Sequence, residues 1–134
     1  MAQPAAKQDD KIVAVDTHIV MVPAAAGAPV PTPVPGHPFN GSIDAALSTD
    51  VFIQRKAAAV KGSTATNMPS HIPMGGPRFQ TPPTNKGTIE MGSSTVFING
   101  KAAARNGDAA STCDDVDPSP KGKVVAVSSV LIGG

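Results

Sequence analysis

Large aromatic residues and leucine are scarce in this chain of 134 residues. It contains no Trp, no Tyr, four Phe and two leucines, Leu47 and Leu131. Few side chains can therefore bury a large apolar area, and a core built from them is thin. Such a chain needs another source of stability, which can be a bound metal, a partner or a closely tied β-topology.

Other absences exclude whole classes of protein. The single cysteine, Cys113, cannot form an internal disulfide. The formal net charge of +1 gives no electrostatic reason to expect nucleic acid or an anionic membrane as a partner. No apolar run is long enough for a transmembrane helix, so we expect no stable membrane insertion. The start, MAQPAAKQDD, lacks the apolar region of a Sec signal peptide. We expect one domain over residues 1–134, with a flexible tail at residues 1–10.

The residues that are plentiful favour strands and turns. The chain has 14 Val and 8 Ile, together with 14 Pro and 13 Gly. β-branched residues pack well on a pleated surface, and Pro and Gly mark turns. The composition therefore predicts an all-β fold of short strands and hairpins with Pro/Gly-rich loops. Five prolines fall within residues 24–38, where they favour polyproline II or a loop over a central strand.

An internal repeat organises the chain. Residues 93–108 read SSTVFINGKAAARNGD, and residues 48–62 read STDVFIQRKAAAVKG. Each copy predicts a strand, a tight turn and a return of small residues, whose alanines let another backbone approach closely. Asn99-Gly100 favours a type I′ turn, whereas Gln54-Arg55 in the other copy indicates a different turn or a bulge.

The two ends of the chain carry a similar strand pattern. Residues 11–15 read KIVAV, and residues 123–127 read KVVAV. Two such strands can pair with each other or occupy equivalent positions in the fold. We therefore expect a third strand-rich unit assembled from both ends, which gives the molecule quasi-threefold internal repeats.

The soft metal ligands of the chain lie in four separate turn-rich segments. They are His18, His37, His71 and Cys113. Three imidazoles and one thiolate can complete a tetrahedral zinc site, and four protein ligands leave no open position for catalysis. The alternative is three solvated histidines and a small buried cysteine.

A further cluster of ionisable residues follows Cys113. Asp114, Asp115 and Asp117 lack the spacing of a calcium-binding loop and predict a solvated acidic turn. No phosphate-binding loop or nucleophile elbow is present in the sequence.

The stretch VFINGKAAARNGD, from Val96 to Asp108, resembles the PAAR-repeat family, which is named for a Pro-Ala-Ala-Arg motif. Residues 102–105, AAAR, stand for that motif with Ala in place of Pro, and Gly107-Asp108 follows as is typical of the family. In the earlier copy Val60 replaces the arginine and Ser63 the aspartate. The resemblance extends over residues 11–134.

The resemblance implies a small, sharp β-cone that caps the trimeric β-helical spike of a contractile injection system, such as type VI secretion. It implies a structural protein and not an enzyme, with the spike protein and effector proteins as partners. It also implies zinc near the point of the cone, with His18, His37, His71 and Cys113 as ligands. Such a protein is cytoplasmic until it is loaded on the apparatus, and is then delivered outside the cell or into a target cell. Since the chain ends at Gly134 after its last strand, we expect no C-terminal effector domain.

Two other functions stay open from the residues alone. A free-standing metal or thiol enzyme requires an open coordination position or a reactive Cys113. A metal-free β-module that binds carbohydrate or protein requires neither.

Overall fold

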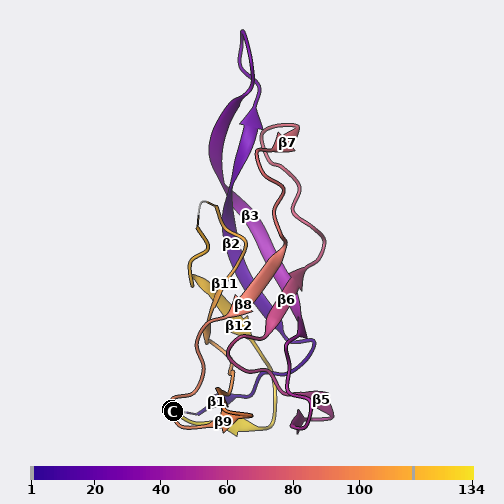
Figure 1. The fold of residues 1–134 in the computed structure, drawn as a ribbon, viewed down its shortest axis with the longest axis vertical. Helices are drawn as coiled ribbons and strands as arrows, with labels where there is room; N and C mark the ends of the chain where they lie inside the picture. Colours follow the sequence, from indigo (N-terminus) through magenta and orange to yellow (C-terminus); the bar gives the residue numbers. More distant parts are fainter. Residues whose placement is uncertain (1, 116) are drawn as a thin grey trace.

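The computed structural model describes residues 2–115 and 117–134. These residues form strands and loops, without a helix, in a molecule with a wide base and a pointed opposite end (Figure 1). The small, cone-shaped all-β fold predicted from the sequence is confirmed. In the described part of the chain there is accordingly no helix that could cross a bilayer.

A seven-stranded sheet forms the body of the cone. In spatial order its strands are β12 (Gly122–Val125), β11 (Ala109–Ser111), β8 (Lys86–Ile89), β6 (Thr64–Asn67), β3 (Val30–Ala45), β2 (Lys11–Val22) and β7 (Arg78–Phe79). β12 also pairs with β2, so the sheet closes around a small core that includes Ile12, Phe39 and Ile89. The two similar end patterns therefore pair with each other, with Val124 opposite Ile12.

Three two-stranded units make the base of the cone (Figure 1). They are β4 (Phe52–Ile53) with β5 (Lys56–Ala57), β9 (Phe97–Ile98) with β10 (Lys101–Ala102), and β1 (Gln3–Pro4) with β13 (Leu131–Ile132). In the third unit the two ends of the chain stand where the other units have a turn. Both ends of the chain therefore form a third unit, as expected, and the arrangement is quasi-threefold. However, residues 3–4 and 131–132 form this unit, whereas the similar runs at residues 11–15 and 123–127 pair in the body.

Residues 3–10 belong to this base, and the expectation of a flexible tail there is wrong. Ala5 and Ala6 are fully buried, and Lys7 is 9 % exposed. These residues are ordered because strand pairing and burial among the other two units hold them.

Backbone hydrogen bonds join the three units in a ring. Ala6 N–H donates to Ala104 O (2.9 Å), Ala59 N–H to Ala6 O (3.0 Å), and Ala104 N–H to Ala59 O (3.1 Å). All three side chains are fully buried. Because the backbones approach so closely, a larger side chain at these positions would displace a neighbour. The repeated alanines are thus explained by the packing at the axis.

Each unit ends in the same side-chain cap, in which an acceptor binds the N–H three residues before it. The donor and acceptor pairs are Lys7 with Asp10 (3.0 Å), Val60 with Ser63 (3.0 Å) and Arg105 with Asp108 (2.7 Å). The residues that precede the acceptors have positive φ, at Asp9 (74°), Gly62 (95°) and Gly107 (87°). Residues 4–10, PAAKQDD, are therefore a third copy of the repeat. Sequence comparison overlooks it because an aspartate stands where the other copies have glycine.

The two base turns share one backbone conformation, against expectation. φ is 49° and 70° at Gln54-Arg55, and 53° and 77° at Asn99-Gly100. The expected different turn or bulge at Gln54-Arg55 is wrong, because Ile53 pairs with Lys56 just as Ile98 pairs with Lys101. The strand register imposes the turn, although a left-handed conformation costs a non-glycine residue about 1 kcal/mol.

β2 and β3 continue beyond the body as a two-stranded hairpin, which forms the pointed end (Figure 1). Pro31 lies opposite Met21, and Pro33 lies opposite Ile19. The polyproline or loop expectation is therefore wrong for the part of the segment that begins at Val30. β3 is an edge strand there, because its pairing with β6 begins only at Gly41, and edge positions accept proline.

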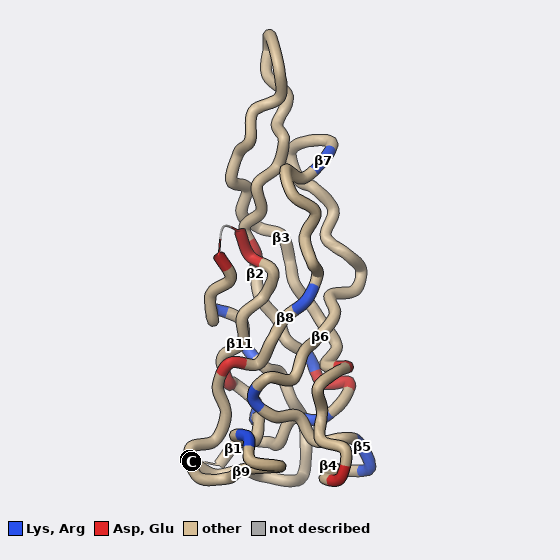
Figure 2. Tube along the Cα trace, viewed as in Figure 1, with Lys and Arg blue, Asp and Glu red and all other residues tan. Residues whose placement is uncertain are grey.

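Charged residues are unevenly distributed along the cone. They lie in the body and base, whereas the projecting hairpin has none (Figure 2). The sequence from Ile19 to Gly36 contains no Asp, Glu, Lys or Arg. Arg78 on the neighbouring β7 pairs with Met21 of this hairpin.

Candidate metal centre

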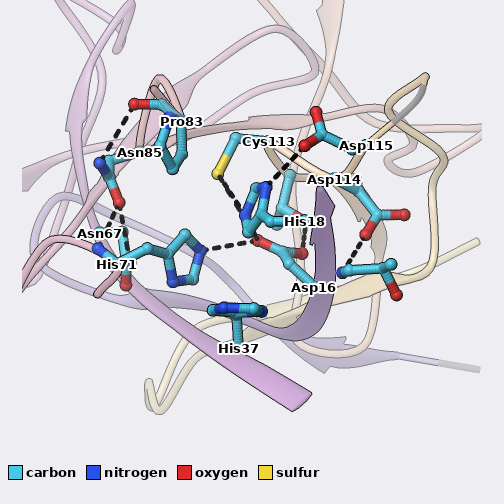
Figure 3. A network of polar contacts seen from close by, with 12 residues as sticks. Asp16, His18, His37, Asn67, His71, Pro83, Asn85, Cys113, Asp114 and Asp115 are labelled. Atoms are coloured by element: carbon cyan, nitrogen blue, oxygen red, sulfur yellow. Dashed lines mark hydrogen bonds and ion pairs between the residues drawn. The ribbon is translucent and has the colours of Figure 1, made fainter. Parts of the chain in front are cut away.

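Four donor side chains converge within the body, between the base and the projecting hairpin. They are Asp16, His18, His71 and Cys113, whose donor atoms all lie within 4.8 Å of one another (Figure 3). Asp16 and His18 lie on β2, His71 follows β6, and Cys113 follows β11. The sheet thus brings together segments that are far apart in the sequence.

Strand periodicity and a β-bulge set the positions of the residues on β2 and β3. Asp16 and His18 are two residues apart on one strand, a spacing that places side chains on the same face. The β2–β3 register shifts between them, so that Asp16 faces His37 while His18 faces Val34. The extra residue lies in β3, where Gly36 has φ of 93°.

The distances within the cluster are those of direct contacts. Asp16 Oδ2 lies 3.0 Å from His71 Nε2, 3.6 Å from Cys113 Sγ and 3.9 Å from His18 Nε2. His18 Nε2 lies 3.8 Å from Cys113 Sγ. Asp16 and His18 are fully buried, the side chain of His71 is 2 % exposed, and Cys113 is 8 % exposed. The cluster is therefore shielded from water.

Asp16 is a buried carboxylate without a Lys or Arg partner among the described residues. Its Oδ1 accepts a hydrogen bond from the Thr112 hydroxyl, and its Oδ2 faces the two histidines and the thiol. Burial of a carboxylate without a compensating cation is unfavourable. A divalent cation among these four donors would supply the missing positive charge.

A second carboxylate orients His18. Asp115 Oδ2 lies 3.3 Å from His18 Nδ1 and accepts a hydrogen bond from Ile19 N–H at 3.0 Å. Contact of a carboxylate with one ring nitrogen fixes the ring and leaves the other nitrogen free for a metal. Asp114 similarly accepts from Thr17 N–H at 2.5 Å and pairs with Lys121 Nζ at 2.8 Å. The expectation of a solvated acidic turn is therefore wrong for these two aspartates, which bind groups on β2 and Lys121.

Asparagine side chains hold the loop that carries His71. Asn85 Oδ1 accepts hydrogen bonds from His71 N–H at 2.9 Å and from Asn67 Nδ2 at 3.2 Å. Asn67 Oδ1 in turn accepts from Asn40 N–H at 2.8 Å, so the loop is tied to β3. Figure 3 also shows the His71 ring directed at Asp16.

His37 is buried beside the cluster but outside the group of four. Its Nδ1 lies 3.1 Å from Val34 O, and its Nε2 accepts a hydrogen bond from Met74 N–H at 3.3 Å. Its ring centroid lies 5.2 Å from that of His18 and 5.8 Å from that of His71. The structure thus groups three of the four predicted ligands and places the fourth next to them. The complete predicted ligand set stays a prediction.

Comparison with known protein families identifies the fold that carries this cluster. The family model described as PAAR motif matches the chain at residues 31–114 and 79–134, which together exceed half of its length. The chain belongs to the PAAR motif family. A search of the curated proteins found no match to this PAAR protein.

The donor set of this PAAR protein fits a tetrahedral zinc ion. Zinc bonds of about 2.0–2.3 Å to oxygen, nitrogen and sulfur place neighbouring ligand atoms about 3.3–3.6 Å apart. Four of the six pairs of donor atoms are 3.0–3.9 Å apart, on both sides of that range, and all six pairs lie within 4.8 Å. Thiolate, imidazole and carboxylate are also the donors that zinc accepts.

Without a metal, the thiol of this PAAR protein is a poor nucleophile. Burial, and after it the charge of Asp16, raise the pKa of the Cys113 thiol to about 12. At neutral pH the metal-free side chain is therefore protonated, and the thiol form does not attack electrophiles. This opposes the thiol-enzyme alternative.

Asp16 is the member of the cluster that the sequence analysis does not select. The signal available for it is its position two residues before His18 in an otherwise apolar strand. A charged residue on the inward face of a strand must be paired or bind a cation.

Proposed function

We propose that this PAAR protein is the structural tip of a contractile injection system and caps the trimeric β-helical spike. The observation that carries the proposal is the threefold pattern of apolar residues on its base. Phe52, Phe97 and Leu131 occupy equivalent positions in the three base units and are 61 %, 60 % and 61 % exposed. Three matched apolar side chains fit a partner with three identical subunits.

Strand register supports the equivalence of these positions. Phe52 pairs with Ala57, Phe97 with Ala102, and Leu131 with Pro4, so each lies opposite the first residue of the repeated Ala or Pro motif. The isoleucine that follows each exposed residue turns toward the base interior, where Ile53 and Ile132 are buried and Ile98 packs against them. Docking on a spike would cover these three exposed apolar side chains and the short strand edges of the base.

Binding to the spike can be tested with a triple variant. The probe is the trimeric β-helical spike protein of the same organism, and the variant combines Phe52→Ser, Phe97→Ser and Leu131→Ser. Val15→Ser, at a position on β2 that is 61 % exposed, is the matched control. We expect the wild type and the control to co-elute with the spike and the triple variant to elute alone. Retention of full affinity by a folded triple variant would contradict docking through this face.

We further propose that zinc is the structural metal of the cluster. The support comes from the buried carboxylate and from the four donor–donor distances of 3.0–3.9 Å described above. Little apolar core is available where the four donor residues converge in the narrowing body. A bound metal would therefore stabilise this part of the cone, where packing cannot. Metal analysis of the purified protein should find one zinc per chain, and chelation should lower the melting temperature. A different divalent metal in the analysis, or unchanged melting after chelation, would refute the assignment.

The spike-tip proposal also has consequences for the location of the protein and for its cargo. We propose that the protein stays in the cytoplasm until it is mounted on the spike, and is then delivered outside the cell or into a target cell, with effector proteins as attached cargo. The uncharged hairpin supports passage through a lipid barrier, because no ionised side chain from Ile19 to Gly36 would need to leave water. Detection of the protein in culture medium only when the apparatus is intact would test this.

A further inference from the structure

We propose that one flank of the body is the docking surface for cargo, and that it takes a protein segment with apolar side chains beside carboxylates. The surface combines an apolar pocket, between β3 and the loop after β6, with a row of lysines and hydroxyls on the base side of that pocket. This inference rests on the cargo part of the proposed function and is independent of docking on the spike.

The pocket has a volume of about 430 Å³, and its exposed lining is mainly apolar. Met68, Ile72 and Met74 line it and are 67 %, 73 % and 44 % exposed. None of the lining residues is Asp, Glu, Lys or Arg. Exposed apolar side chains around a concave surface are typical of binding sites, and methionine adapts its shape to a partner. His37 and His71 also line the pocket, so the variants below leave both unaltered.

A row of four polar side chains crosses four strands beside the pocket. Strand register places Lys11 of β2 opposite Ser42 of β3. Ser42 in turn lies opposite Thr66 of β6, and Thr66 lies opposite Lys86 of β8. The residue that follows each of the four in sequence is buried, so the row itself faces outward.

Both lysines of the row extend over the neighbouring strand toward the centre of the row. Lys11 Nζ donates to Ser42 Oγ at 2.5 Å, and Lys86 Nζ donates to Thr66 Oγ1 at 2.6 Å. Neither lysine forms an ion pair with a carboxylate of the described residues. Two ammonium groups held on adjacent strands repel each other, and a carboxylate placed between them would remove that repulsion. The row is therefore complementary in charge to an acidic side chain.

The row and the pocket belong to one continuous surface. Asn40 and Pro38 follow Ser42 at every second position of β3 toward the hairpin, and both line the pocket. Met68 lies two residues beyond Thr66, and its N–H donates to Asn40 O at 3.4 Å. Because two strand residues span about 7 Å, a bound segment of a few residues reaches from the pocket to the lysines.

A cargo protein fits this flank better than the spike or a lipid surface. The flank lies in the body, whereas the proposed spike contact is at the base, so a docked spike leaves the flank uncovered (Figure 1). A concave pocket receives a protruding side chain, which a flat layer of lipid headgroups does not supply. Two lysines, each bound to a hydroxyl, also give little attraction to an anionic bilayer.

Selection of peptides from a random displayed library, with the full chain as bait, tests the apolar half of the proposal. We expect the selected peptides to combine Leu, Ile or Phe with Asp or Glu. The double variant Met68→Ser with Ile72→Ser should weaken the tightest peptide at least about 10-fold in Kd. Met91→Ser, at a position that is 59 % exposed and does not line the pocket, is the matched control and should bind as the wild type does.

The charged half is tested with the same peptide and the double variant Lys11→Gln with Lys86→Gln. We expect binding about 10-fold weaker at low salt and a smaller difference at high salt, because salt screens the attraction between the lysines and the carboxylates. Lys61→Gln, which removes an exposed lysine outside the row, is the control and should leave the affinity unchanged.

Several results would overturn the proposal. They are a selection that yields no binder, selected peptides without acidic residues, and full affinity of either double variant. Binding of the wild type to vesicles of phosphatidylglycerol and phosphatidylcholine, in place of peptides, would assign the flank to lipid. Co-elution of each variant with the spike, which we expect to be unchanged, shows that the variant is folded. If the wild type binds the spike but no peptide, this inference fails alone, and if it binds peptides but not the spike, the spike-tip proposal fails.

Discussion

Cys113 illustrates at the scale of one residue how the surroundings determine chemistry. Its thiol has a pKa raised to about 12 from an ordinary value of 9.0, first by burial and then by the charge of Asp16. The folded, metal-free protein therefore holds the proton more tightly than the unfolded chain. The stabilisation from this group is complete below pH 9 and is lost as the pH rises toward 12.

We expect the thiol of the chelated, folded protein to resist alkylation at pH 8. The rate should begin to rise only well above pH 9, since the thiolate is the reactive species. The measurement is the rate of modification by iodoacetamide against pH, with the urea-unfolded protein as the control that shows ordinary reactivity. Rapid alkylation of the native protein at pH 8 would show that the thiol is activated.

Ser63 offers a second prediction for one residue. Its hydroxyl is fully buried, accepts from Val60 N–H at 3.0 Å and donates to Ala46 O at 2.8 Å. Ser63→Ala leaves both backbone groups without a partner, so we expect the free energy of unfolding to fall by about 1–3 kcal/mol. Ser129→Ala, at an exposed position, should change it by less than about 0.5 kcal/mol. Urea unfolding followed by far-ultraviolet circular dichroism suits a chain without Trp or Tyr, and equal effects would contradict the role of the cap.

Most of the donor residues of the site could be predicted from the sequence, but their burial and their hydrogen-bond partners could not. His18, His71 and Cys113 are recognisable because few residue types bind zinc. The sequence does not point to Asp16, because an aspartate is usually solvated and its burial here depends on how β2 packs against the loop after β11. The engagement of His37 depends on the path of the loop that brings Met74 N–H to it, which no local pattern encodes.

At the scale of the elements, a local sequence signal predicts one base turn but neither the second base turn nor the proline-rich part of β3. Asn99-Gly100 specifies its hairpin directly, whereas Gln54-Arg55 adopts the same turn only because the repeated register requires it. The sequence predicts polyproline II or a loop for the prolines of β3, because nothing in it shows that this stretch lies at a sheet edge. Their positions become understandable only once the pairing with β2 is known.

Replacement of Gln54-Arg55 by Asn-Gly should therefore stabilise the protein. Both positions have positive φ, which asparagine and glycine adopt with less strain. We expect the free energy of unfolding to rise by about 1 kcal/mol, measured by urea unfolding. The hydrogen bond from Gln54 Nε2 to Ser129 Oγ is exposed, so its loss should matter little. The reciprocal change of Asn99-Gly100 to Gln-Arg should destabilise, and a stabilised reciprocal variant would exclude turn strain as the cause.

At the scale of the whole molecule, one chain forms a threefold base and an asymmetric point. The base repeats one unit three times, with caps at Asp10, Ser63 and Asp108 that bind equivalent backbone groups. The metal cluster takes its residues from β2 and from loops of different units, so it has no threefold copies. A protein of this design can face a symmetric partner with its base and still hold a single, unrepeated site in its body.

Threefold docking predicts a distributed loss of affinity when the base is altered one residue at a time. Phe52→Ser, Phe97→Ser and Leu131→Ser each remove one of three equally exposed apolar side chains. Each should weaken binding to the trimeric spike by about 1–3 kcal/mol, which corresponds to roughly 5- to 150-fold in Kd. Calorimetric titration with the spike should also give one chain per trimer, because a second chain cannot share the same threefold axis. If one substitution abolished binding while the other two had no effect, the contact would be one-sided, and the equivalence of the three units would be a feature of folding and not of docking.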